Sequence, residues 1–217
     1  MSWASVAVRR PKWVAKELAY RAGLRSYRPD SAADWDSFYR RKSSEHALEV
    51  KQLRTLAKYG ITVGYLSMFA PRAEILDVGC GPGSLRHYLQ PGAFRRYVGV
   101  DNSPHAIEVA QTSFDDPQTS FVLADEIPSD LQPFSAVVML DVLYHVEAPM
   151  RTIQRVKEVM QPDGIVIASH WRHPGEWMLL DMLDREFERL DMVVFENHRD
   201  QILSPLGHRI SCHRRVG

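Results

Sequence analysis

The stretch from Glu74 to Leu85 reads Glu-Ile-Leu-Asp-Val-Gly-Cys-Gly-Pro-Gly-Ser-Leu, and it decides the fold. The apolar residues before the first glycine predict a buried strand. The three glycines Gly79, Gly81 and Gly83 predict a turn, because glycine tolerates positive φ and lets a ligand approach bare backbone. The residues that follow predict a helix whose first N–H groups face the same point. Strand, turn and helix together therefore predict a ligand site.

The spacing of the glycines separates the enzyme classes that use such a turn for an adenine-containing cofactor. Dinucleotide enzymes use G-x-G-x-x-G, whereas here the glycines fall at 79, 81 and 83 and Asp77 lies two places before the first. This arrangement resembles the class I S-adenosylmethionine-dependent methyltransferases, whose first motif reads approximately D/E-x-G-x-G-x-G. The resemblance implies S-adenosylmethionine as cofactor and S-adenosylhomocysteine as product. A purely structural turn is the alternative for this stretch taken alone.

Apolar strands alternate with amphipathic helices along the rest of the chain, which predicts a mostly parallel sheet buried on both faces. The resemblance adds a sixth strand and an antiparallel seventh. The predicted fold class is α/β: a Rossmann-like, mostly parallel seven-stranded sheet with an antiparallel last strand, helices on both faces and an N-terminal helical cap. The predicted strands are residues 74–78, 97–101, 121–125, 136–141, 164–169, 192–196 and 208–213, and the later helices begin at 84 and 104 and span 150–160 and 176–189.

Residues 1–60 precede the first strand and contain three helix candidates, at 11–24, 33–41 and 45–59. We predict an N-terminal helical extension or cap over residues 1–60 and a methyltransferase domain over 61–217. The extension holds thirteen Lys or Arg against six Asp or Glu, which gives +7, and the zero total charge leaves −7 for the remainder. Solvated helices explain this charge, and peripheral membrane contact through residues 9–28 is the alternative.

No apolar run reaches the ~18 residues that span a bilayer, and the first residues lack the pattern of a signal peptide. A cytoplasmic protein is therefore expected. The two cysteines, Cys80 and Cys212, lie far apart in the sequence, so neither a disulfide framework nor a zinc site is predicted. The sequence does not decide the oligomeric state.

Acidic residues end several of the predicted strands, and ligands of parallel sheets bind at that edge. The resemblance implies that Asp101 accepts hydrogen bonds from the ribose hydroxyls, although NAD enzymes place an acid there too. It also implies that Asp125 takes the adenine amino group and that Ile127 lies against the ring. The predicted cofactor-binding residues are Asp77, Gly79, Cys80, Gly81, Gly83, Asp101, Asn102, Asp125, Glu126, Ile127 and Asp141.

Two residues after the fourth predicted strand are the candidates for catalysis. His145 can take a proton from a hydroxyl because the usual pKa of imidazole lies near neutral pH. Relatives that carry a histidine here without proven base function leave structural support as an equal alternative. Tyr144 is predicted to orient an amine or to shield the sulfonium.

Substrate contacts are predicted from the N-terminal cap and from the loop after the fifth strand. The cap supplies Trp35 and Tyr39, whose alternative role is to dock the cap on the domain. The loop supplies His170, Trp171 and Arg172, with Arg172 available for an acidic group. A solvated polar loop is the alternative, and no metal is predicted.

The sequence argues against a nucleic-acid substrate. The residues after the fourth strand lack the Asp/Asn-Pro-Pro-aromatic motif that enzymes methylating exocyclic amines tend to carry, and they lack a cysteine. The predicted function is therefore methyl transfer from S-adenosylmethionine to an oxygen or nitrogen of a small-molecule metabolite. A lipid-linked or glycan acceptor at a membrane surface, an NAD-linked oxidoreductase and a non-catalytic partner subunit of the same fold are the alternatives.

Overall fold

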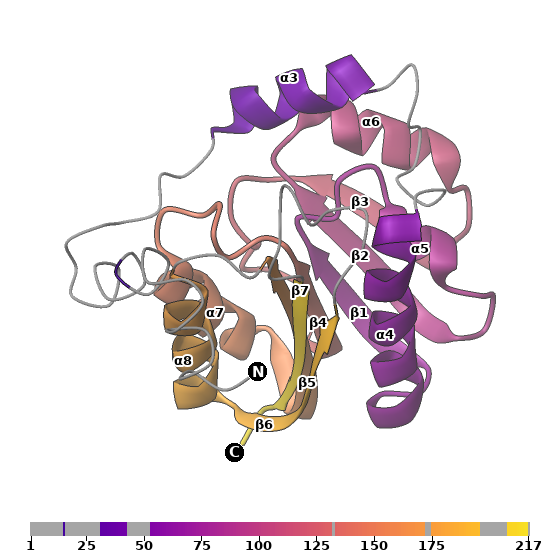
Figure 1. Cartoon of the computed structure of the whole chain (residues 1–217). Helices are drawn as coiled ribbons and strands as arrows, with labels where there is room; N and C mark the ends of the chain where they lie inside the picture. The colour runs from indigo at the N-terminus through magenta and orange to yellow at the C-terminus, as the bar shows by residue number, and fades with distance from the viewer. Residues whose placement is uncertain are drawn as a thin grey trace.

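The computed structural model describes residues 15, 31–42, 53–131, 133–171, 175–195 and 208–216. Seven strands form a single sheet in the order β3-β2-β1-β4-β5-β7-β6 (Figure 1). Strands β1 to β5 run parallel to one another, and β7 is antiparallel to both β5 and β6. The strands are β1 (Ala73–Val78), β2 (Phe94–Asp101), β3 (Thr119–Leu123), β4 (Phe134–Leu140), β5 (Met160–Trp171), β6 (Glu188–Phe195) and β7 (His208–Arg214). The predicted fold class is confirmed.

Helices cover both faces of the sheet. They are α3 (Ala32–Lys42), α4 (Leu53–Phe69), α5 (Ser84–Tyr88), α6 (Pro104–Ser113), α7 (Pro149–Glu158) and α8 (Glu176–Glu186). Successive strand residues point to opposite faces, so Ile75 joins the core under α4, α5 and α6, whereas Leu76 joins the core under α7 and α8. Figure 1 shows α3 lying apart from these layers, along α6. Among the described residues, no helix is both long and apolar enough to cross a membrane.

The helix predicted to end at Tyr59 continues to Phe69, so the predicted domain boundary at residue 60 falls inside α4. Gly60 and Gly64 do not break the helix, and its second half packs Tyr65 and Leu66 against the sheet. Leu56 is exposed in this helix, whereas Lys58 and Tyr59 are buried, so the face that packs on the sheet includes residues 58 and 59. The candidate helix at 11–24, apart from residue 15, and the start of the 45–59 candidate lie outside the described residues.

The end of the chain differs from the prediction in where a helix gives way to a strand. α8 ends at Glu186 and β6 begins at Glu188, whereas the helix was predicted to continue to residue 189. The strand starts early because Glu188 and Arg189 pair with Arg214 and His213 of β7. This long pairing places the first residue of β7, His208, at the edge of the sheet where the parallel strands end.

Candidate functional site

The glycine turn after β1 is held by backbone hydrogen bonds. The N–H groups of Gly79 and Cys80 donate to the carbonyl of Val100 over 2.8 and 3.1 Å. Gly79 has φ 69°, and a Cβ placed on it would lie 2.6 Å from Cγ2 of Val142. The turn therefore needs glycine at position 79 both for its conformation and for the approach of the loop after β4.

The carboxylate of Asp101 fixes the other side of this turn. It accepts hydrogen bonds from the N–H groups of Gly81 over 2.8 Å and Ser103 over 2.9 Å. Burial raises the pKa of Asp101, and these backbone donors oppose the rise. Asp101 and Asn102 both line the cleft. The predicted ribose-binding acid thus lies at the predicted edge and also joins β2 to the glycine turn.

Asp77 lies beneath the turn, outside the residues that line the cleft. Its carboxyl faces the core under α4 to α6 and accepts a 2.5 Å hydrogen bond from the hydroxyl of Tyr97. Burial, against the hydrogen bond from Tyr97 and with a contribution from the nearby Asp101, raises the pKa of Asp77 to about 7. Asp77 therefore supports the turn from beneath, and its contact with the cofactor stays a prediction.

A cleft of about 1730 Å³ opens at the carboxyl ends of the strands and brings most of the predicted residues together. Gly83 is not among them, because its Cα faces Phe114 and Phe121 in the core. The predicted residues that line the cleft are Trp35, Tyr39, Gly79, Cys80, Gly81, Asp101, Asn102, Asp125, Glu126, Ile127, Asp141, Tyr144 and His145.

Residues 124–131 follow β3, carry the predicted adenine contacts and form no helix. Asp125 and Glu126 are exposed, whereas Ile127 is buried. Arg155 of α7 holds this segment by donating to the carbonyls of Ile127 over 3.2 Å and Pro128 over 2.8 Å. Arg155, which was not predicted as a site residue, therefore positions one side of the cleft.

A charged cluster at the ends of β4, β5 and β7 was not predicted as a unit. Nζ of Lys58, from α4, lies 2.9 Å from one carboxylate oxygen of Asp141, and the hydroxyl of Ser169 donates to the other over 3.0 Å. Burial alone would raise the pKa of Asp141, but Lys58, His208 and Ser169 lower it on balance. Asp141 also has φ 62°. In the sequence, the position of Lys58 next to Tyr59, which is buried in α4, could have indicated that Lys58 is buried as well.

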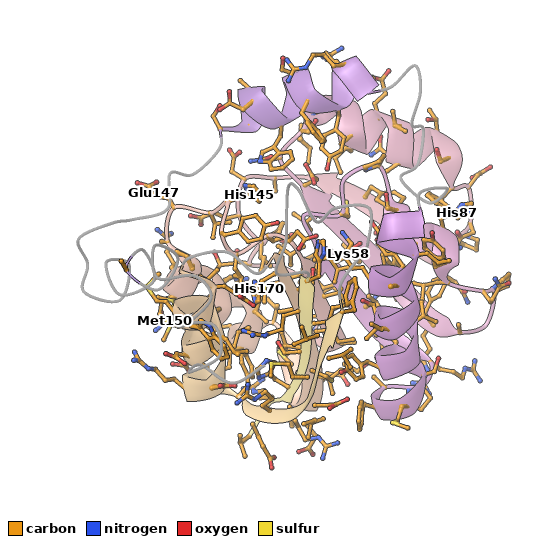
Figure 2. All side chains as sticks on the ribbon, viewed as in Figure 1. Lys58, His87, His145, Glu147, Met150 and His170 are labelled. Atoms are coloured by element: carbon orange, nitrogen blue, oxygen red, sulfur yellow. The ribbon has the colours of Figure 1, made fainter. Side chains whose placement is uncertain are left out.

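Aromatic side chains of α3 and of the loop after β4 also line the cleft. The ring of Trp35 meets the ring of His145 edge to face at 4.7 Å, and Tyr144 lies 4.2 Å from His145. Tyr39 covers the glycine turn, since a Cβ on Gly81 would lie 2.6 Å from its hydroxyl. Figure 2 shows His145 beneath α3, at the same end of the sheet as Lys58.

A carboxylate of α3 holds this helix over the site. Asp36 accepts a hydrogen bond from the N–H of His105 over 2.9 Å and a longer one, 3.3 Å, from the hydroxyl of Ser103. Both donors lie at the start of α6, directly after Asp101 and Asn102. Helix α3 is therefore attached to the part of the cleft that contains Asp101 and Asn102.

The predicted substrate loop is only partly a loop. β5 continues through Trp171, and His170 is fully buried in it opposite Arg209 of β7. Arg209 forms a buried ion pair with Glu176 at 2.8 Å. His170 was predicted to contact substrate, but it lies outside the cleft lining because pairing with β7 extends the strand. The side chain of Trp171 and all of Arg172 lie outside the described residues.

Comparisons with known proteins agree with this geometry. A family model described as a methyltransferase domain matches residues 37–206. A ubiquinone biosynthesis O-methyltransferase from Azorhizobium caulinodans is 36% identical over 101 residues, covering 44% of this chain and 39% of that protein. A tRNA U34 carboxymethyltransferase from Cellvibrio japonicus is 29% identical over 99 residues, covering 43% and 31%. These matches span less than half of the length of the curated relatives.

Solved structures share the fold at low sequence identity. The N-methyltransferase NodS from Bradyrhizobium japonicum WM9, in complex with S-adenosyl-L-homocysteine, has a TM-score of 0.71 at 16% identity, with 84% of this chain and 99% of that chain covered. The [4+2]-cyclase SpnF has a TM-score of 0.61 at 18% identity, with 74% and 81% covered. Because the family model matches most of the chain, the chain belongs to the class I methyltransferases, whose cofactor is S-adenosylmethionine.

Proposed function

We propose that the protein transfers the methyl group of S-adenosylmethionine to an oxygen or nitrogen of a small-molecule metabolite. The observation that supports this most directly is the size and division of the cleft. Its volume of about 1730 Å³ exceeds the roughly 300–1,000 Å³ that is usual for a single ligand. The glycine turn lies at one side and His145 at another, so a cofactor and an acceptor have room together.

The residues of the cleft fit the parts of this cofactor. Asp101 and Asn102 offer acceptors to the ribose diol, and the segment with Asp125 and Ile127 offers a carboxylate and an apolar side chain to adenine. The paired charges of Lys58 and Asp141 suit the carboxylate and ammonium of the amino-acid end. When bound, the cofactor supplies a methyl group on a positively charged sulfur.

His145 is our candidate for the group that receives the acceptor's proton. It lines the cleft between Trp35 and Tyr144, which fix its ring. A positioned imidazole can accept a proton from a hydroxyl near neutral pH. For an amine acceptor, Tyr144 and His145 would orient the nitrogen. Because methyl transfer is an in-line displacement, alignment of the two reactants supplies much of the rate.

A small acceptor is favoured over a nucleic acid by the charges at the cleft. In the part of the chain that the structure describes, the lining holds six carboxylates, of Asp101, Asp125, Glu126, Asp141, Glu147 and Glu158, against the three cations Lys58, Arg151 and Arg155. This excess of negative charge repels a phosphate backbone. The relatives' names include both an O-methyltransferase and a tRNA-modifying enzyme, so they do not choose the acceptor. Membrane contact through residues 9–28 stays a prediction, since those residues lie outside the described ones apart from residue 15.

Calorimetry followed by a turnover assay tests the proposal. We expect S-adenosylmethionine and S-adenosylhomocysteine to bind and NAD to give no heat. With a panel of hydroxylated and amine-bearing metabolites, formation of S-adenosylhomocysteine would identify the acceptor. Binding of NAD without a response to S-adenosylmethionine would refute the proposal, and cofactor binding with turnover of tRNA alone would refute its small-molecule part.

A further inference from the structure

We infer that the acceptor is an aromatic compound with a hydroxyl on its ring. This inference rests on the proposed function and narrows it to a substrate class. It follows from two observations: aromatic and acidic side chains line different parts of the cleft, and the rings beside His145 are only partly buried.

Aromatic rings gather on the side of the cleft formed by α3 and by the loop after β4. Trp35, Phe38 and Tyr39 come from successive turns of α3, and Tyr144 comes from the loop. The exposed carboxylates of Asp125 and Glu126 lie instead beyond β3. Tyr39 covers the glycine turn, and the acids beyond β3 suit the cofactor's adenine. The rings left for a second molecule are therefore those around His145, which are Trp35, Phe38 and Tyr144.

The rings contact one another in geometries that leave them partly open to the cleft. Trp35 meets Phe38 at 5.4 Å and His145 at 4.7 Å, both edge to face. Tyr144 is tilted by 50° against His145. None of these four side chains is fully buried. A planar ring that enters the cleft can therefore join the cluster by edge-to-face or offset contacts, which a saturated ring cannot make.

The place of His145 within this cluster favours a hydroxyl on that ring. A phenolic hydroxyl ionises near pH 10, as in tyrosine, so an imidazole can remove its proton far more easily than that of an aliphatic alcohol. In the transfer, the O–H proton goes to a ring nitrogen of His145 and the oxygen bonds to the methyl carbon. The carbon–sulfur bond breaks and leaves its electron pair on sulfur, so charges balance.

A matched pair of ligands tests the aromatic preference. 2-Naphthol and decahydro-2-naphthol share a bicyclic skeleton and a hydroxyl but differ in aromaticity. With protein saturated by S-adenosylhomocysteine, we expect 2-naphthol to bind at least about tenfold more tightly, measured by saturation-transfer NMR and competition. Equal binding, tighter binding of the saturated compound, or binding of neither would overturn the inference. If S-adenosylhomocysteine itself does not bind, the proposed function fails first, and the two failures are thus distinguishable.

Variants of Trp35 and His145 connect the preference to these side chains. Trp35→Leu should reduce the ratio of the two affinities at least threefold, whereas Trp35→Phe, which keeps a ring, should retain most of it. His145→Ala should keep 2-naphthol binding but lose methylation of 2-naphthol or of a phenolic acceptor from the panel. An unchanged ratio of the two affinities in Trp35→Leu would show that the aromatic cluster does not recognise the aromatic ring of the ligand. Unchanged turnover in His145→Ala would show that His145 does not accept the proton.

Discussion

The two sides of the cleft are built in different ways. The side with the glycine turn consists of backbone groups from one nearly continuous region, in which the turn donates to Val100 and Asp101 accepts from Gly81. The other side consists of side chains from α3, α4, the loop after β4 and the start of β7. The first side is fixed wherever β1 and β2 pair. The second exists only when distant segments have packed together.

This difference predicts that a change in the glycine turn has the largest effect on cofactor binding. In Gly79→Val, a side chain must fit at φ 69° and against Val142, where a Cβ would lie 2.6 Å from Cγ2. We expect the affinity for S-adenosylmethionine to fall at least ~100-fold, as measured by calorimetry, because backbone strain and the clash both distort the turn.

A second glycine offers the matched control. A Cβ on Gly60 in α4 would have no neighbour within 4 Å, so Gly60→Ala should keep the affinity and stabilise the helix by about 0.5–1 kcal/mol. Normal cofactor affinity in Gly79→Val would show that the backbone-built side is more tolerant than its geometry indicates.

The charged pair on the second side should come next in size. Lys58→Met leaves the carboxylate of Asp141 without its ammonium at 2.9 Å, in a site where both side chains are less than one-fifth exposed. We expect roughly tenfold weaker cofactor binding and a loss of about 1–3 kcal/mol in the free energy of unfolding, since an unpaired charge is left partly buried.

A double variant separates the loss of the Lys58–Asp141 ion pair from the cost of leaving the carboxylate of Asp141 without its cation. Asp141→Asn is compatible with φ 62°, because asparagine tolerates the left-handed region. Lys58→Met combined with Asp141→Asn should recover part of the stability lost in Lys58→Met, as urea denaturation would show. Strict additivity of the two losses would argue against the pair.

Arg155 gives a smaller effect that sharpens the comparison on the adenine side. Arg155→Ala removes two hydrogen bonds to the segment that follows β3. This segment must then become ordered when the cofactor binds, which costs binding free energy. We expect about fivefold weaker binding of S-adenosylmethionine, seen as a raised KM with kcat nearly unchanged.

Arg151, one turn away on α7, is the control. It makes an exposed pair with Glu126 at 3.2 Å, and such pairs contribute little. Arg151→Ala should therefore keep the wild-type KM. Equal effects of the two substitutions would mean that Arg155 acts through charge alone.

Asp77 should have the smallest effect on binding and a visible effect on the pH dependence of stability. Its folded pKa of about 7 lies above the usual 3.8, so the stability that its protonated form contributes is present below pH 3.8 and is lost as pH rises toward 7. Asp77→Asn still accepts from Tyr97 and cannot ionise. Its free energy of unfolding should change less between pH 4 and 8 than that of the wild type. Parallel pH profiles from urea denaturation would contradict this placement.

The same division explains what the sequence could predict. The glycine spacing and the apolar runs are local patterns, so the turn after β1, the seven strands and the place of Asp101 at the carboxyl end of β2 were predicted correctly. Lys58 was missed because its burial and its pairing with Asp141 depend on the packing of α4 against β5 and β7. His170 was misplaced because its burial depends on pairing with β7, some forty residues later in the chain. A turn or a strand end that depends on one segment can be predicted from the sequence. A contact between two segments that lie far apart in the chain cannot.

The position of β7 has a consequence for how the molecule is made. β7 lies between β5 and β6 and pairs with both along most of their length. During synthesis, β6 leaves the ribosome first and has no strand to pair with until residues 208–214 follow. The exposed edge of β5 is therefore open to wrong pairing during that interval, and His208 can join Asp141 and Lys58 only after β7 has paired with β5.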